Sequence, residues 1–123
     1  MYSAQLLDHF EHPRNAGDLA EADAVVEISN PVCGDVDRLG LKIQADRIDQ
    51  IRFKAKGCVP ALACGSALTE LALGKTVVDA RTLNRDDLIM AVGGLPQAST
   101  HAAQLALDAL SAALNQISDA SRR

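Results

Sequence analysis

The stretch that decides the fold is Phe53-Lys54-Ala55-Lys56-Gly57-Cys58-Val59-Pro60-Ala61-Leu62-Ala63-Cys64-Gly65-Ser66. It predicts the end of a strand, a glycine turn that carries a cysteine, and a helix that opens on Pro60. A thiol at Cys58 would sit where backbone N–H groups have no intrahelical partner, and the local field there favours its thiolate. A single cysteine at a helix start is a weak signal, so its meaning depends on what the rest of the chain brings near it.

The composition is typical of one soluble domain, which we expect to span residues 1–123. The chain has 123 residues, 48% of them hydrophobic but only 2% aromatic, so its core must be built from Leu, Ile, Val and Ala. Twelve basic residues against sixteen acidic ones give a net charge of −4. This balance argues against nucleic acid or an anionic membrane as the main partner.

The cysteines and the apolar runs indicate a cytoplasmic protein. No apolar run approaches the length that spans a bilayer, and the amino terminus lacks a signal-peptide pattern. Three cysteines are an odd number, which is a poor basis for a disulfide framework. In a reducing compartment, free thiols are more often buried residues, ligands or nucleophiles.

Strand-like runs precede Cys58. Ala24 to Ser29 is rich in branched residues, and apolar and polar residues alternate from Val36 to Gln44 and from Ile48 to Lys56. Period two places one face of each later strand on the core and the other toward water. The short connections favour an antiparallel meander.

Helical patterns surround these strands. A short amphipathic helix should follow Ser3 and stop before Pro13, and a largely buried helix should run from Pro60 to a stop at Gly74. Asn84 can cap a short helix through Val92. The last helix shows one apolar stripe, made of Ala103, Leu107, Leu110, Leu114 and Ile117. We therefore expect an α+β domain, a three-stranded antiparallel sheet with helices packed on one face, and a frayed tail at 118–123.

Two chemically capable residues lie in the loop Asn30–Asp35. Pro31 and Gly34 favour a loop tip, on which Cys33 and Asp35 are two residues apart and can turn toward one cation. The plain alternative is an ordinary turn whose cysteine fills a gap. Because the second strand starts after Cys33 and the third ends before Cys58, antiparallel pairing brings both cysteines to the same end of the sheet.

His101 is the third element of this candidate site. It falls opposite the apolar stripe of the last helix, so it is either a solvated first-turn histidine or a ligand. A thiolate-rich set with an imidazole and a carboxylate suits zinc or an iron–sulfur cluster better than magnesium or calcium.

Three further residues are weaker candidates. Cys64 shares a stripe with Leu68 and Leu71, so we expect a buried, inert thiol in preference to a further ligand. His9 and His12 are spaced to hold a metal as a pair, but solvated histidines at a helix end are the favoured interpretation.

The motifs resemble those of the U-type iron–sulfur cluster scaffold family, which comprises IscU, SufU and the amino-terminal domain of NifU. The resemblance covers nearly the whole chain. Its most specific part is the combination of Asn30-Pro31-Val32-Cys33-Gly34-Asp35 with a later strand that ends in Gly57-Cys58. It also includes Tyr2-Ser3, Asp8 to Asn15, Arg52-Phe53-Lys54, Ala67-Leu68-Thr69-Glu70, Gly74-Lys75, Gly94-Leu95-Pro96 and His101.

The resemblance implies a function. Members of that family accept sulfur from a cysteine desulfurase, assemble a 2Fe–2S cluster on three cysteines helped by an aspartate or histidine, and pass it to acceptor apo-proteins. By position, Cys33, Asp35, Cys58 and His101 match the site residues of the family, with Asp35 as an exchangeable oxygen ligand.

The chain departs from the family pattern at three places. The third family cysteine directly follows the histidine, where this chain has Ala102. After Gly-Cys the family usually has small and polar residues, whereas this chain has Val59-Pro60-Ala61-Leu62. Cys64 is a cysteine that the family pattern does not include. Leu95 to Ser99 matches only in part the Leu-Pro-Pro-Val-Lys segment that IscU members offer a dedicated chaperone, so this chaperone interaction is not carried over.

Three hypotheses follow from these residues. The first is a scaffold that binds iron or a cluster through Cys33, Asp35, Cys58 and His101. In the second, the same four groups form a stable zinc site with a structural or regulatory role. In the third, Cys58 is a nucleophile or persulfide carrier near His101, but the sequence offers no oxyanion hole or substrate pocket, so this enzyme hypothesis ranks last.

Overall fold

The three strand-like runs form the antiparallel meander that they predict. The computed structural model describes residues 2–31 and 34–121, with side chains up to Ile117. The strands are β1 (Ala24–Ser29), β2 (Val36–Gln44) and β3 (Arg47–Lys56), in the order β1-β2-β3. Only Ala45 and Asp46 separate β2 from β3, and both have positive φ (52° and 62°), as a two-residue hairpin turn requires.

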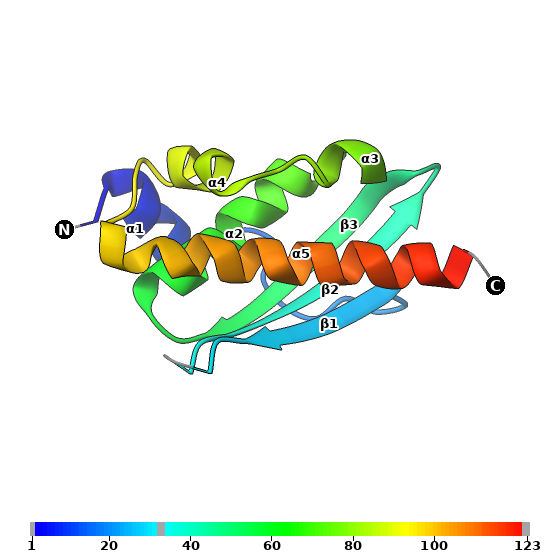
Figure 1. Ribbon diagram of the computed structural model, residues 1–123, viewed down its shortest axis with the longest axis horizontal. Coiled ribbons are helices and arrows are strands. Elements are labelled where there is room, and N and C mark those ends of the chain that lie inside the picture. Colours follow the sequence, from blue (N-terminus) through cyan, green and yellow to red (C-terminus); the bar gives the residue numbers. More distant parts are fainter. Residues whose placement is uncertain (1, 32–33, 122–123) are drawn as a thin grey trace.

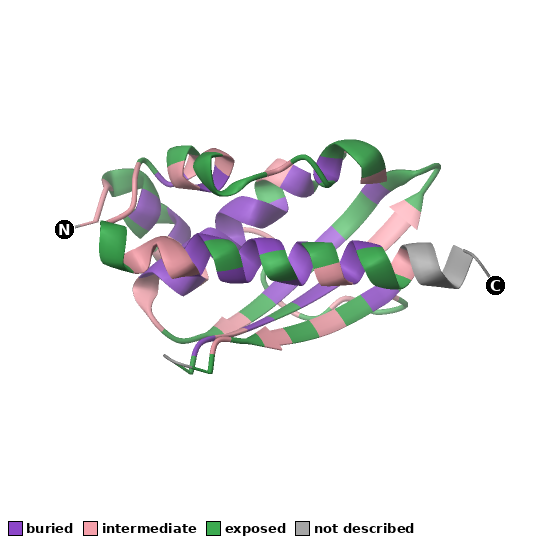
Figure 2. Ribbon diagram, in the orientation of Figure 1, coloured by how far each residue is buried: buried purple, intermediate pink, exposed green. Residues whose placement is uncertain are grey.

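Helices cover one face of this sheet, as expected for the α+β class. The largest are α2 (Val59–Ala72) and α5 (Thr100–Ser121): α5 packs on β1 and β2, and α2 packs on β3 (Figure 1). The core between them contains Leu39, Leu41, Ile51, Leu68 and Leu110. Figure 2 shows the resulting pattern, in which buried residues alternate with exposed ones along the strands and form a stripe along α5.

A close approach holds α2 against β3. A Cβ placed on Gly65 would lie 2.7 Å from Cδ2 of Phe53, which is closer than packed carbon atoms come. The helix therefore reaches the strand only because residue 65 has no side chain.

A second, smaller core lies where the amino-terminal helix meets α2. The helix α1 (Ala4–Glu11) is capped by Ser3, whose hydroxyl accepts the N–H of Leu6 at 3.0 Å. Leu6 packs with Ala63, Ala67 and Val92. The helix α4 (Arg85–Ala91) begins at Asn84 with a reciprocal capping box to Asp87, so the predicted cap is confirmed.

The structure differs from the sequence-based expectations in four places. The strand β3 begins at Arg47, one residue earlier than predicted, and α3 (Val77–Ala80) and a 3-10 turn η1 (Gln97–Ser99) were not predicted. The helix α5 continues to Ser121, so the backbone of the expected frayed tail is helical up to that residue. None of the helices in the described part of the chain is long and apolar enough to cross a membrane.

Candidate functional site

Cys58 lies at the junction that the opening stretch predicts. The strand β3 ends at Lys56, and Cys58 is the N-cap residue of α2, with extended backbone angles (φ −73°, ψ 163°). Pro60 follows in the first turn of the helix, where a missing N–H has no cost. The Cys58 side chain is partly buried and is not needed as a helix cap.

Asp35 holds the Cys58 turn with two hydrogen bonds. The backbone N–H of Cys58 donates to Oδ1 of Asp35 at 3.1 Å, and the Cys58 Sγ–H donates to Oδ2 at 3.2 Å. Asp35 is only 3% exposed. A buried carboxylate is thus fixed directly beside the thiol.

Gly57 makes room for that carboxylate. Its φ is +141°, and a Cβ at this position would lie 2.0 Å from Oδ1 of Asp35. Both the backbone angle and the space exclude any larger residue. The Gly-Cys pair is therefore a geometric requirement of the Asp35–Cys58 contact.

His101 enters from the first turn of α5. Its Nδ1 donates to the carbonyl oxygen of Ala98 at 3.1 Å, because a carbonyl can only accept. The other ring nitrogen, Nε2, is then the atom that a neutral imidazole would offer to a metal ion. That Nε2 faces Oδ2 of Asp35 at 3.7 Å, and among the described residues it has no hydrogen-bond partner.

The three side chains converge. One ligand atom each from Asp35, Cys58 and His101 lies within 4.8 Å of the others. They line a cavity of about 390 Å³, to which Tyr2, Pro60 and Ser99 also contribute. In Figure 1 the ends of β3 and β1 and the start of α5 lie at the same end of the molecule. A thiol, a carboxylate and an imidazole with a buried, unpartnered Nε2 among the described residues fit a transition metal ion.

The remaining predicted site residues fall into three cases. Cys33 lies outside the described residues, so its part in the site stays a prediction. Cys64 is fully buried in the main core, as its stripe predicted, and burial raises the pKa of its thiol to about 12. Ala102, which follows His101, is 1% exposed and packs in the same core.

Sequence reasoning missed Asp37. This residue is 2% exposed on the core side of β2, its Oδ1 has no hydrogen-bond partner among the described residues, and burial raises its pKa to about 7. Asp37 is in phase with Leu39 and Leu41, so the alternation of the strand could have shown that it points inward.

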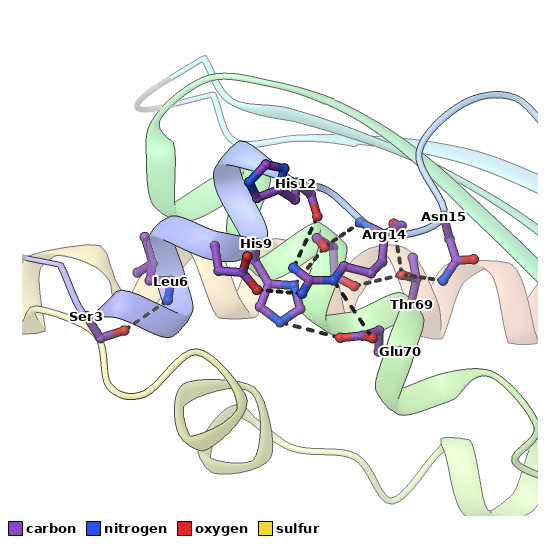
Figure 3. A network of polar contacts seen from close by, with 10 residues as sticks. Ser3, Leu6, His9, His12, Arg14, Asn15, Thr69 and Glu70 are labelled. Atoms are coloured by element: carbon purple, nitrogen blue, oxygen red, sulfur yellow. Dashed lines mark hydrogen bonds and ion pairs between the residues drawn. The ribbon is translucent and has the colours of Figure 1, made fainter.

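His9 is a correction to the sequence analysis. It was expected to be a solvated histidine at a helix end, but it is 7% exposed, whereas His12 is exposed as expected. The Nδ1 of His9 lies 2.8 Å from Oγ of Ser66, and its Nε2 lies 3.5 Å from Oε1 of Glu70 (Figure 3). Desolvation by burial lowers the pKa of His9. His9 and His12 therefore do not form a metal-binding pair.

The segment that follows α1 belongs to the same network. The N–H of Arg14 donates to Oγ of Ser66 at 2.9 Å, and Nδ2 of Asn15 donates to Oγ1 of Thr69 at 3.1 Å (Figure 3). The side chain of Arg14 also contacts Asp8 and Glu70. These contacts explain why the Asp8 to Asn15 motif and the Thr69-Glu70 motif occur together: they join α1 to α2.

Comparison with known proteins identifies the family. The family model described as "NifU-like N terminal domain" matches residues 1–122. The iron–sulfur cluster assembly scaffold protein IscU 1 of Archaeoglobus fulgidus is 44% identical over 114 residues, which cover 93% of this chain and 74% of that relative. The iron–sulfur cluster assembly scaffold protein IscU of Aquifex aeolicus is 39% identical over 115 residues, covering 92% of this chain and 73% of the relative.

A solved structure agrees in fold. The crystal structure of a NifU-like protein (N-terminal) from Brucella abortus superimposes with a TM-score of 0.78 at 19% identity, covering 95% of this chain and 94% of that one. Together, the match of the family model to nearly the whole chain and the identity to two scaffold proteins place this chain in the family of NifU-like N-terminal domains.

Proposed function

We propose that this domain is an iron–sulfur cluster assembly scaffold, which holds iron and sulfide on Cys33, Asp35, Cys58 and His101 and then passes the cluster on. The observation that carries the proposal is the convergence of a thiol sulfur, a carboxylate oxygen and an imidazole nitrogen within 4.8 Å of one another. Two relatives that share 39% and 44% of their aligned residues with this chain are named as scaffolds of this kind.

The hydrogen bonds suggest how the site accepts iron. A thiol binds iron as its thiolate, so Cys58 must lose its proton. Its S–H already points at Oδ2 of Asp35, 3.2 Å away, so the carboxylate can relay that proton to solvent before Asp35 itself binds iron. The Nδ1 contact to Ala98 keeps the lone pair of His101 Nε2 facing the same space.

The donor set favours release as well as binding. A carboxylate is a harder donor than a thiolate and holds a soft, sulfide-bridged iron less firmly. With Ala102 in place of a third family cysteine, Asp35 and His101 would supply two of the four donors. We therefore propose a bound 2Fe–2S cluster that exchanges readily, supplied with sulfur by a cysteine desulfurase and passed to acceptor apo-proteins.

Anaerobic reconstitution with iron and sulfide tests this function. The wild-type protein should develop the visible charge-transfer absorption of a cluster, and Cys58→Ser should lose most of it. Cys64→Ala is the matched control, because Cys64 is fully buried in the core and should leave the absorption intact. Absence of the absorption in the wild type, or its full retention in Cys58→Ser, would contradict the proposal.

Metal analysis separates the zinc alternative. Protein purified without oxygen should contain iron and acid-labile sulfide, or should take them up. Zinc that iron and sulfide cannot displace would instead indicate a permanent structural site.

A further inference from the structure

The edge of β3 next to Cys58 is only partly paired. The N–H of Phe53 donates to Asn15 O at 3.0 Å, and its carbonyl oxygen accepts the N–H of Gly17 at 2.8 Å, so the backbone of Phe53 faces outward. Because backbone groups alternate sides along a strand, Ala55 presents its N–H and C=O at the same edge. Within the described ranges, no hydrogen bond joins these Ala55 groups to a residue outside the sheet. Such an edge is a template for a further strand.

A cavity lies against this edge. Its volume is about 720 Å³. Ala55, Leu62 and Val36 give it apolar walls, and Pro13 and Ala16 form part of its boundary. An extended segment beside Ala55 would therefore bury its apolar side chains.

The rim of this cavity carries positive charge in an acidic chain. Arg38, Lys54 and Lys56 line it, and among the described lining residues Glu27 alone is acidic. Arg38 and Lys54 are partly neutralised by Asp18, at 3.5 and 2.9 Å. Lys56 is exposed, and no ion pair involves it among residues 2–31 and 34–121. The rim thus offers one uncompensated cation beside the free edge.

We infer that this edge and cavity form a docking site for an extended segment of a partner protein in which apolar and acidic residues alternate. The segment adds as a strand beside Ala55. Its acidic side chains then lie on the outer face of the sheet near Lys54 and Lys56, and its apolar ones lie on the other face against Ala55 and Leu62.

The position of this docking site gives it a role in delivery. Ala55 precedes Cys58 by three residues, about 10 Å of extended chain, so a docked partner lies beside the candidate metal site. The docking itself does not depend on the proposed scaffold function. Only the identity of the partner, a sulfur donor or a cluster acceptor, rests on that function. Cluster reconstitution and docking can therefore fail separately.

The test uses an acetylated and amidated peptide of alternating valine and glutamate, titrated into the full-length isotope-labelled protein and followed by NMR. We expect shifts at Ala55 and Lys56 and slower hydrogen exchange of the Ala55 amide. Lys56→Glu should weaken binding about fivefold or more, since it turns an attraction into a repulsion. Arg81→Glu, an exposed charge reversal outside the cavity lining, is the matched control and should leave the affinity unchanged.

Two control peptides separate strand addition from simple charge attraction. Methylation of the peptide's backbone nitrogens removes its ladder donors, and replacement of glutamate by lysine reverses its charge, so each should abolish the shifts. Three results would overturn the inference. They are equal binding by the methylated peptide, equal affinity of the peptide for Lys56→Glu, and the absence of a shift at Ala55 at millimolar peptide. Unchanged cluster reconstitution in Lys56→Glu is expected and confirms that the two functions are separable.

Discussion

Gly57 has no side chain, and the Asp35 carboxylate occupies the space that a Cβ at this position would take. We predict that Gly57→Ala lowers the free energy of unfolding by about 2 kcal/mol or more, because the new Cβ adds a clash with Oδ1 of Asp35 to the strain of positive φ. The same change should weaken iron binding, since the carboxylate must move away from Cys58. Urea denaturation and iron titration measure the two effects.

Gly74→Ala is the matched control for this prediction. Gly74 also has a positive φ (+84°), but a Cβ there meets nothing within 4 Å. Gly74→Ala should therefore lower the free energy of unfolding through backbone strain alone, by about 1 kcal/mol, and leave iron binding unchanged. Equal losses in the two variants would show that Gly57 acts only through its backbone angle and does not position Asp35.

Asp37 is a buried polar group whose Oδ1 has no partner among the described residues, and such a group should lower stability. At pH 8, which is above its raised pKa of about 7, the carboxylate is charged inside the core. We predict that Asp37→Asn raises the free energy of unfolding at this pH by about 1–3 kcal/mol, because an amide avoids burying that charge. Urea denaturation of the metal-free protein measures it, with the exposed Asp49→Asn as a control expected to change little. A destabilised Asp37→Asn would mean that the charge has a stabilising partner.

At the scale of elements, the network between α1 and α2 should make stability depend on pH. His9 is buried and its pKa is lowered, chiefly by desolvation, while Arg14 lowers it further and Glu70 and Asp8 oppose the shift. The unfolded chain therefore binds a proton more readily than the folded protein. Stability is fully present above the unfolded pKa of about 6.5 and is lost as pH falls toward the lower folded value.

Variants of the two histidines test this dependence. We predict that the decline in the free energy of unfolding below about pH 6.5 is smaller in His9→Gln than in the wild type. His12→Gln, which changes an exposed histidine three residues away, should keep the wild-type profile. The profile comes from urea denaturation at a series of pH values. Identical profiles in all three proteins would assign the acid dependence to other groups.

The elements themselves could largely be predicted from sequence, because their signals are local. Period two located the second and third strands, and antiparallel pairing correctly placed Asp35 and Cys58 at one end of the sheet. The environment of His9 could not be predicted, because Ser66 lies 57 positions away and no local pattern links the two residues. Whether Cys33 completes the site remains a prediction.

At the scale of the whole molecule, the candidate site exists only when the fold is complete. Asp35 comes from the loop before β2, Cys58 from the β3–α2 junction and His101 from α5, so the unfolded chain has no such arrangement. A ligand that binds the folded protein alone stabilises it by an amount set by its concentration relative to Kd. Iron binding at this site should therefore be visible as a change in global stability.

We predict that ferrous iron at a hundredfold excess over its Kd, added without oxygen, stabilises the protein by about 2.7 kcal/mol and raises Tm by several degrees. His101→Ala should lose most of this rise, because it removes the Nε2 lone pair that faces Asp35. His12→Ala removes an exposed histidine and should keep the full rise. Differential scanning calorimetry measures all three proteins. An equal rise in wild type and His101→Ala would place the bound iron elsewhere, because a ligand stabilises the fold only through the residues that hold it.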